Sequence, residues 1–263
     1  ESLYVNEENR FPSVVERKLR KAYSLEIKTL NAGMSGNNSF HSLLAFLAKV
    51  IPQNVSIAVL MHNVNDFSLL VKTENYWDAP ATKSIIIGWI QEPAITSFFR
   101  AIKNLWFPNL YLYLKPRLFP NLIITDEFSK YRKQSLDIYG STIEAEFERS
   151  LRSFVMLCKI WNVIPVLMTQ FNRVNSDDFA YKKFINSKPY IKLQTDSFLE
   201  QYRNFNDVVR RVALDTNTFL IDLDKKVPQS SDYMVDVVHL NDRGSLLVGD
   251  IVSKELIKVL PQR

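Results

Sequence analysis

Apolar residues along the chain recur with two different spacings, and each spacing predicts a different kind of element. Apolar residues three and four positions apart predict amphipathic helices, whereas short apolar runs predict strands buried in a parallel sheet. The helical spacing occurs over residues 11–23, 39–50, 143–161, 193–215 and 241–260. Strand-like runs, continuous or alternating, occur over residues 25–30, 55–61, 163–168 and 219–221. Strands that alternate with helices predict an α/β domain built as a three-layer α/β/α sandwich around a parallel sheet.

Residues 76–141 interrupt this alternation. The segment is rich in aromatic residues and also holds Pro80, Pro93, Pro108, Pro116 and Pro120. We interpret it as an insertion, helical from about Thr82 to Trp106, within a single domain that spans residues 1–263. Three roles stay open for it: extra packing, a substrate-binding lid, or an amphipathic element that contacts a membrane peripherally. The last role is favoured by the basic residues among the aromatic ones, which are Arg100, Lys103, Lys115 and Arg117.

The composition is that of an ordinary globular protein, with 263 residues of which 46% are apolar and 23% are charged. The net charge of +5 is spread along the chain. This spread favours a solvated surface over a nucleic-acid partner, while an acidic glycan or a membrane surface stays open. The single cysteine, Cys158, excludes an internal disulfide and is expected to be buried and inert. No apolar run reaches the ~18 residues of a transmembrane helix, and no signal peptide is visible.

Three short polar motifs follow predicted strands. Residues 31–37 form a glycine-containing turn after the first strand-like run, and residues 63–66 read Asn-Val-Asn-Asp after the second. Residues 236–239 read Asp-Val-Val-His after the last strand and just before the final helix. Ligands of parallel α/β sheets bind beyond the carboxyl ends of the strands. The three motifs are therefore expected to converge at one edge of the sheet.

The residue types in these motifs are those of a serine-hydrolase site. Asp236 lies one turn before His239, a spacing at which a carboxylate can fix the imidazole tautomer and stabilise the imidazolium. Gly36 allows a backbone N–H to approach a ligand, and Asn65 carries a side-chain NH₂, so both can donate to an oxyanion. Each motif alone also has a structural interpretation: a surface Asp beside a helix-capping His, an ordinary turn, or an Asx-type turn. In the second motif, Asp66 is expected to be the residue that stabilises the loop.

The remaining histidines, His41 and His62, are expected to make structural hydrogen bonds. No HExxH or CxxC motif marks a metal site, and the expected chemistry needs neither a metal nor an organic cofactor. In the final helix, Asn241 or Asp242 is expected to be the N-cap, and Gly244 is expected to allow close packing.

Taken together, the order and spacing of the motifs resemble those of the SGNH (GDSL-type) hydrolase family over nearly the whole chain. The resemblance implies a flavodoxin-like α/β/α fold and a serine esterase mechanism. It implies that Gly36 and Asn65 are the oxyanion donors, and that Asp236 and His239 are the acid and base of the catalytic triad. One departure is the pair Asn63-Val64, which stands where glycines are common in the family and alters the expected shape of that loop.

A larger departure concerns the nucleophile. The family opens with a strand followed by Gly-Asp-Ser or Gly-Gly-Ser-Thr-Thr, and residues 1–12 resemble the loop and helix start that follow the second version. We therefore expect the nucleophilic serine just upstream of Glu1, with Ser2 as the alternative. Under both alignments the family's first strand is missing, although it lies between the next two strands of the family's sheet. Its removal would expose unpaired backbone and core, so we expect the natural polypeptide to extend upstream.

The resulting prediction is a serine esterase or deacylase whose substrate is a small-molecule or glycan ester, such as an acylated carbohydrate or lipid. Two alternatives stay open: an acyltransferase that acts on a polysaccharide, and a non-catalytic domain that binds a glycan or a partner. The expected location is the bacterial periplasm or a membrane to which an upstream segment anchors the protein. The sequence does not indicate an oligomeric state.

Overall fold

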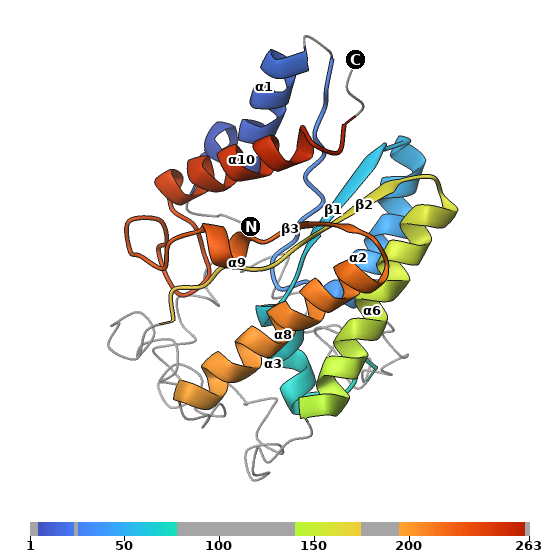
Figure 1. Ribbon diagram of the computed structural model, residues 1–263, viewed down its shortest axis with the longest axis vertical. Coiled ribbons are helices and arrows are strands. Elements are labelled where there is room, and N and C mark those ends of the chain that lie inside the picture. Colours follow the sequence, from blue (N-terminus) through green and yellow to red (C-terminus); the bar gives the residue numbers. More distant parts are fainter. Residues whose placement is uncertain (1–4, 24–25, 78–139, 175–194, 261–263) are drawn as a thin grey trace, which may run out of the picture. The chain divides into compact units, whose positions relative to one another are not determined.

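The computed structural model describes residues 5–23, 26–77, 140–174 and 195–260 (Figure 1). The chain divides into two units, Glu1–Tyr76 with Ser135–Arg263, and Trp77–Gln134. The predicted insertion at residues 76–141 falls almost wholly outside the described residues. Its helix, its lid role and its membrane contact therefore stay predictions, and the elements below belong to the first unit.

A parallel sheet of three strands, in the order β1-β2-β3, lies at the centre of this unit. The strands are β1 (Ile57–Met61), β2 (Ile164–Met168) and β3 (Phe219–Ile221). In the ladder, Leu60 pairs with Leu167, and Leu167 pairs with Leu220 on its other side. The strands all run in one direction, so their carboxyl ends lie at one edge of the sheet. The predicted parallel sheet is confirmed.

Helices separate the strands along the chain. The α-helices are α1 (Phe11–Tyr23), α2 (Ser39–Ala45), α3 (Val64–Thr73), α6 (Gly140–Ile160), α8 (Thr195–Asp215), α9 (Leu223–Lys226) and α10 (Asp242–Leu256). Shorter turns are the 3₁₀ helices η1 (Glu7–Asn9) and η3 (Ile51–Gln53) and the π-helical η2 (Phe46–Val50). The five helices predicted from the apolar spacing are all present, the second as α2 continued by η2. The sequence pattern missed α3 and the single turn α9.

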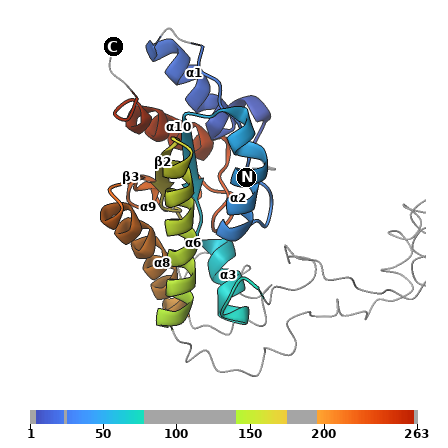
Figure 2. The ribbon, with the colours of Figure 1, turned by 90° about the vertical axis from the view of Figure 1, so that its right-hand side faces the viewer.

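Helices cover both faces of the sheet, which confirms the predicted three-layer α/β/α sandwich (Figures 1 and 2). On one face, Leu60 and Leu167 pack with apolar residues of α2, α3, α6 and α8. On the other face, Val166 and Ile221 pack with residues of α1, α9 and α10. Successive strand residues point to opposite faces, and Val166 and Leu167 are both fully buried. Burial on both faces explains why the central strand, β2, is a continuous apolar run.

Two glycines allow α10 to pack closely against its neighbours. A Cβ at Gly249 would lie 2.6 Å from the Val14 Cβ of α1, the helix that runs beside α10 (Figure 1). A Cβ at Gly244 would lie 1.9 Å from the carbonyl oxygen of Tyr233. The Asn241 side chain accepts a hydrogen bond from the Gly244 N–H at 2.9 Å, so Asn241 is the N-cap. The predicted packing role of Gly244 and the predicted cap are confirmed.

One predicted strand, at residues 25–30, is wrong. Its described part, residues 26–30, has no regular secondary structure and pairs with none of the three strands. The segment is instead bonded to α1, because the Thr29 N–H donates to Glu16 Oε2 at 2.7 Å and the Thr29 hydroxyl donates to the Pro12 carbonyl at 3.1 Å. An alternating pattern forms a strand only where a neighbouring strand offers hydrogen bonds, and here a carboxylate takes the backbone donor.

Cys158 lies in α6 and is fully buried. Burial raises the pKa of its thiol to about 12, so almost no thiolate forms at neutral pH. The expectation of an inert, buried cysteine is confirmed. Within the described ranges, none of the helices is both long and apolar enough to cross a membrane.

Candidate functional site

The Asp236–His239 motif forms a closed turn after β3. Its flanks are joined by an antiparallel bridge between Met234 and Leu240, and the Val235 N–H donates to the His239 carbonyl at 2.8 Å. Inside the turn, Asp236 Oδ2 lies 2.7 Å from His239 Nδ1. The other carboxylate oxygen, Oδ1, accepts the backbone N–H of Val238 at 3.0 Å and that of His239 at 2.8 Å. Asp236 therefore bonds both the side chain and the backbone of its own motif.

The charge of Asp236 determines the tautomer of His239. Burial acts to raise the pKa of Asp236, but the hydrogen bonds from His239 and from the backbone of Val238 and His239 outweigh it, and the pKa lies below its ordinary value. The carboxylate is therefore ionised at neutral pH and can only accept hydrogen bonds. In the neutral imidazole this carboxylate favours the tautomer with the proton on Nδ1, which leaves on Nε2 the lone pair that a general base requires. The side chains of His239 and Asp236 are 39% and 41% exposed, so the imidazole is accessible to solvent.

The glycine motif forms the turn that leads into α2. Gly36 has a φ of +73°, a conformation that favours glycine, and a Cβ built on it would have no atom within 4 Å. The turn is closed by a hydrogen bond from the Asn37 N–H to the Met34 carbonyl at 3.3 Å. Directly after it, Asn38 caps α2 by accepting the His41 N–H at 3.0 Å. His41 completes this capping box through its ring, which confirms its structural role.

Asn65 joins the second motif to the glycine motif. It lies in the first turn of α3, although the sequence analysis placed these residues in a loop. Its side-chain NH₂ donates to the carbonyl oxygen of Asn37 at 2.8 Å, next to Gly36. An amide NH₂ carries two hydrogens, so this bond fixes the side chain and leaves the other hydrogen for a second acceptor. The structure thus brings Asn65, one expected oxyanion donor, against the residue that follows Gly36, the other.

Further hydrogen bonds connect the ends of β1 and β2 with the Asp236–His239 turn. Asn63 donates to Asn206 of α8 at 2.9 Å, and the same Asn206 oxygen accepts the backbone N–H of Gln170, which follows β2, at 3.1 Å. Three residues on, Arg173 donates from Nη1 to the Met234 carbonyl and from its backbone N–H to the Val237 carbonyl, both at 2.8 Å. The strand-end segments are therefore tied together at the carboxyl edge of the sheet, as the sequence predicted.

Two polar clusters at this edge were missed by the sequence analysis. One is an ion-pair network in which Arg210 of α8 binds both oxygens of Asp222, at 2.8 and 2.9 Å, and also Asp224 at 2.7 Å. This network fixes the segment after β3. No short sequence motif predicts it, because Arg210 and its partners lie on different elements of the fold. The other is centred on the fully buried Asp66. The spacing of His62 and Asp66, four residues apart, was its only sequence signal.

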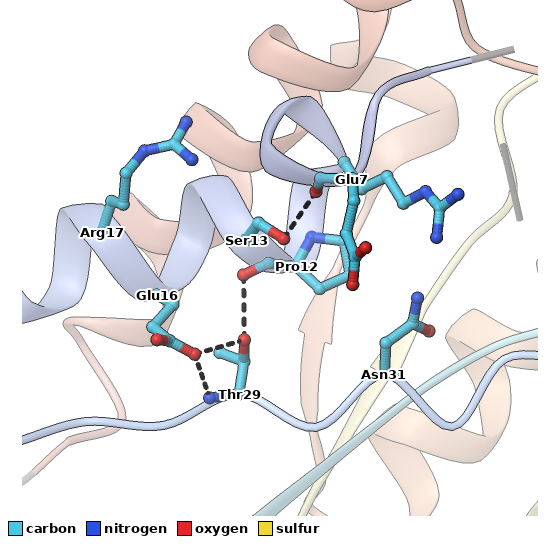
Figure 3. A pocket seen from close by; sticks show the side chains of 8 residues that line it. Glu7, Pro12, Ser13, Glu16, Arg17, Thr29 and Asn31 are labelled. Carbon is cyan, nitrogen blue, oxygen red and sulfur yellow. Dashed lines mark hydrogen bonds between the residues drawn. The ribbon is translucent and has the colours of Figure 1, made fainter.

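A pocket of about 460 Å³ lies between α1 and the segment that contains Thr29 and Asn31, where the glycine motif begins (Figure 3). It is lined by Glu7, Arg10, Pro12, Ser13, Glu16, Arg17, Thr29 and Asn31. Two carboxylates, of Glu7 and Glu16, and two arginines line it, and Thr29 donates two hydrogen bonds to Glu16 on one side. None of Gly36, Asn65, Asp236 and His239 lines this pocket, so it is separate from the candidate site.

Ser2, the alternative nucleophile, lies outside the described residues, so its role stays a prediction. Over the described ranges, no group of three His, Cys, Asp or Glu side chains is placed to hold a metal ion.

The fold is similar to those of several solved hydrolases. Axe2, described as an acetylxylan esterase from Geobacillus stearothermophilus, matches with a TM-score of 0.51 at 18% identity, over 94% of this chain and 80% of that one. AlAXEase, described as an acetyl xylan esterase, matches with a TM-score of 0.51 at 14% identity, over 98% of each chain. LAE5, described as an alpha/beta hydrolase enzyme from the metagenome of Lake Arreo, Spain, matches with a TM-score of 0.51 at 12% identity, over 96% of this chain and 84% of that one. These likenesses establish the fold. No protein-family model and no curated protein matches the chain.

Proposed function

We propose that this protein is an SGNH (GDSL-type) serine esterase that removes acyl groups, such as acetyl, from a carbohydrate. The observation that carries the proposal is the 2.7 Å contact between Asp236 and His239, at the sheet edge that also holds Gly36 and Asn65. The likeness of the fold to enzymes described as acetyl xylan esterases supports the choice of an acylated carbohydrate as substrate.

In the proposed mechanism, the nucleophile is a serine just upstream of Glu1. His239 Nε2 takes the proton of the serine hydroxyl as its oxygen attacks the ester carbonyl. The Gly36 N–H and the Asn65 NH₂ stabilise the oxyanion of the tetrahedral intermediate. His239 then returns the proton to the departing sugar oxygen as the C–O bond breaks and the acyl-serine forms. His239 next takes a proton from water as the water oxygen attacks the acyl-serine, and it returns this proton to the serine oxygen as the bond to the acyl group breaks and the acid leaves.

Labelling of the full-length polypeptide with a fluorophosphonate tests this proposal. We expect the modified peptide, mapped by mass spectrometry, to lie upstream of Glu1 and the label to disappear in His239→Ala. We also expect the protein to release acetate from acetylated xylan. Label on Ser2 would move the nucleophile but keep the mechanism. The absence of both label and acetate release would contradict the proposal and favour a non-catalytic binding domain, whereas acetyl transfer to a glycan acceptor in excess of acetate release would identify an acyltransferase.

A further inference from the structure

A buried carboxylate directly follows Asn65, one proposed oxyanion donor, and bonds the start of the helix that follows Gly36, the other. Asp66 is fully buried in the first turn of α3. Its Oδ1 accepts three hydrogen bonds: from the Ser39 N–H at 2.9 Å, the Ser39 hydroxyl at 2.5 Å and the Tyr76 hydroxyl at 2.6 Å. An unpaired buried charge would be very costly, so these bonds strongly favour one arrangement of α3 relative to the start of α2.

The second oxygen of the carboxylate faces a histidine. Asp66 Oδ2 lies 3.3 Å from His62 Nδ1, and His62 Nε2 lies 2.8 Å from the hydroxyl of Ser42 in α2. Burial acts to raise the pKa of Asp66, but the charge of His62 and the hydrogen bonds from His62, Ser39 and Tyr76 hold it below its ordinary value. The group is therefore an anion inside the protein, bonded by Ser39 of α2 on one side and facing His62, which contacts Ser42 of α2, on the other.

The order Ser42–His62–Asp66 has the connectivity of a catalytic triad, but its setting is structural. The Ser42 N–H donates to the Asn38 carbonyl at 3.2 Å within the helix, so it is not available to stabilise an oxyanion. The His62 side chain is only 11% exposed. The contacts from Ser42 through His62 to Asp66 therefore hold the carboxylate in place, and Ser42 is not placed to act as a nucleophile.

The carboxylate is placed where it can set the spacing of the two donors. Asn65 directly precedes Asp66, and Gly36 lies three residues before Ser39. Two bridges cross between these segments: Asn65 to the Asn37 carbonyl at 2.8 Å, and Ser39 to Asp66. Removing one bridge would let the donors separate while α2 and α3 stay folded. A displacement of about 1 Å in such a group can cost on the order of 10²-fold in rate.

We infer that Asp66, acting through Ser39, is a positioning residue that sets the distance between the Gly36 N–H and the Asn65 NH₂. The inference rests on the proposed esterase function. It concerns residues that do not contact the substrate, so it predicts a loss in kcat with little change in KM. By contrast, a merely structural role predicts a loss of stability alone.

A pair of matched variants in the full-length polypeptide separates these roles. Ser39→Ala removes the Ser39 hydroxyl, which bonds Asp66 and lies 2.7 Å from the Ser150 hydroxyl, and leaves only the backbone N–H of residue 39 to bond Asp66. Tyr76→Phe removes another hydrogen bond to the same oxygen and keeps the stacking of the ring on Phe40. Tyr76 also lies 3.1 Å from the Ser39 hydroxyl, but it belongs to neither donor segment. Both variants are expected to lower Tm, whereas only Ser39→Ala should lower kcat for 4-nitrophenyl acetate, by roughly tenfold or more.

The outcomes distinguish this inference from the proposed function. Equal kcat values for Ser39→Ala and Tyr76→Phe, in an active wild type, would overturn the positioning role alone. A fluorophosphonate label on Ser42 would also overturn it, because Ser42 would then be a nucleophile. An inactive full-length wild type would overturn the proposed function and, with it, this inference. Asp66→Asn gives a second measurement: when folded, it should lower kcat by roughly 10–100-fold with KM nearly unchanged.

Discussion

The two halves of the candidate site are held in place by different means. The half formed by Asp236 and His239 is a local turn, in which the carboxylate bonds the imidazole and two backbone N–H groups of its own motif. Both of its side chains are about 40% exposed. The half formed by Gly36 and Asn65 rests on residues distant in sequence, and its anchor, Asp66, is fully buried.

The difference indicates a division of labour between the halves. The imidazole must gain and lose a proton at each step, which requires access to substrate and water, and a local turn can hold it without burying it. The oxyanion donors only need to stay where charge develops, and a buried ionic anchor gives them that rigidity. Substitutions in the first half should therefore affect the chemistry with little loss of stability. Substitutions in the second should affect both.

The largest effect is expected for Asp236→Asn in the full-length polypeptide. Asparagine can hold the ring through its NH₂, which stabilises the wrong imidazole tautomer, so kcat should fall by roughly 10⁴-fold. Acetate release under saturating substrate measures this loss. Asp207→Asn is the matched control, because the Asp207 side chain is 62% exposed and its pair with Arg210 contributes little. Turnover of Asp236→Asn similar to that of the control would remove Asp236 from the site.

Asn65→Ala should have the next largest effect. Loss of one oxyanion donor typically lowers kcat by about 10²–10³-fold. Because Asn65 also bonds the Asn37 carbonyl, Tm should fall as well, unlike in Asp236→Asn. Asn6→Ala is a suitable control, since the exposed Asn6 makes no side-chain capping bond. A normal kcat in Asn65→Ala would show that the oxyanion is stabilised elsewhere.

Gly36→Ala should have a smaller effect. A Cβ at this position meets no atom within 4 Å, so the cost comes from the φ of +73° alone, about 1–2 kcal/mol for a residue with a side chain. Denaturant unfolding measures it. In Gly33→Ala, the new Cβ would meet only the Asn31 side chain, at 3.2 Å, in the same loop. If the two variants were equally stable, the positive φ at Gly36 would not be needed.

The smallest effect is expected in the pH dependence of stability. The pKa of Asp236 is lowered in the folded protein, so its contribution to stability is present above the ordinary pKa of an aspartate and is lost as the pH falls through the folded-state value. Tm should therefore fall less steeply for Asp236→Asn than for wild type between about pH 5 and about pH 2. Because Asp236 is half-exposed, the difference should be slight. Parallel Tm curves would show that its hydrogen bonds do not stabilise the fold.

The features that could be predicted from the sequence are those held by local contacts, as in the Asp236–His239 half of the site. The Asp236–His239 pair, the Asn241 cap and the apolar strands depend on residues a few positions apart, so pattern and spacing were enough to predict them. The bond from Asn65 to the Asn37 carbonyl and the bond from Ser39 to Asp66 were not predictable, because they join residues 28 and 27 positions apart. The wrong strand at residues 25–30 has the same origin, since its outcome depends on a contact between Thr29 and Glu16 in α1. Helix α3 was missed because its first turn coincides with a motif read as a loop.

The reactivity of Cys158 toward a thiol reagent can report local opening of this fold. Cys158 is the only cysteine in the chain, it lies in the core between α6 and the sheet, and its thiol has a pKa of about 12. A thiol reagent can reach it only when α6 separates from the sheet, and the exposed thiol then reacts far faster because its pKa returns toward the ordinary ~8.5. The rate of labelling under native conditions therefore measures how often the core around the end of α6 opens locally. No reporter group has to be engineered into the protein.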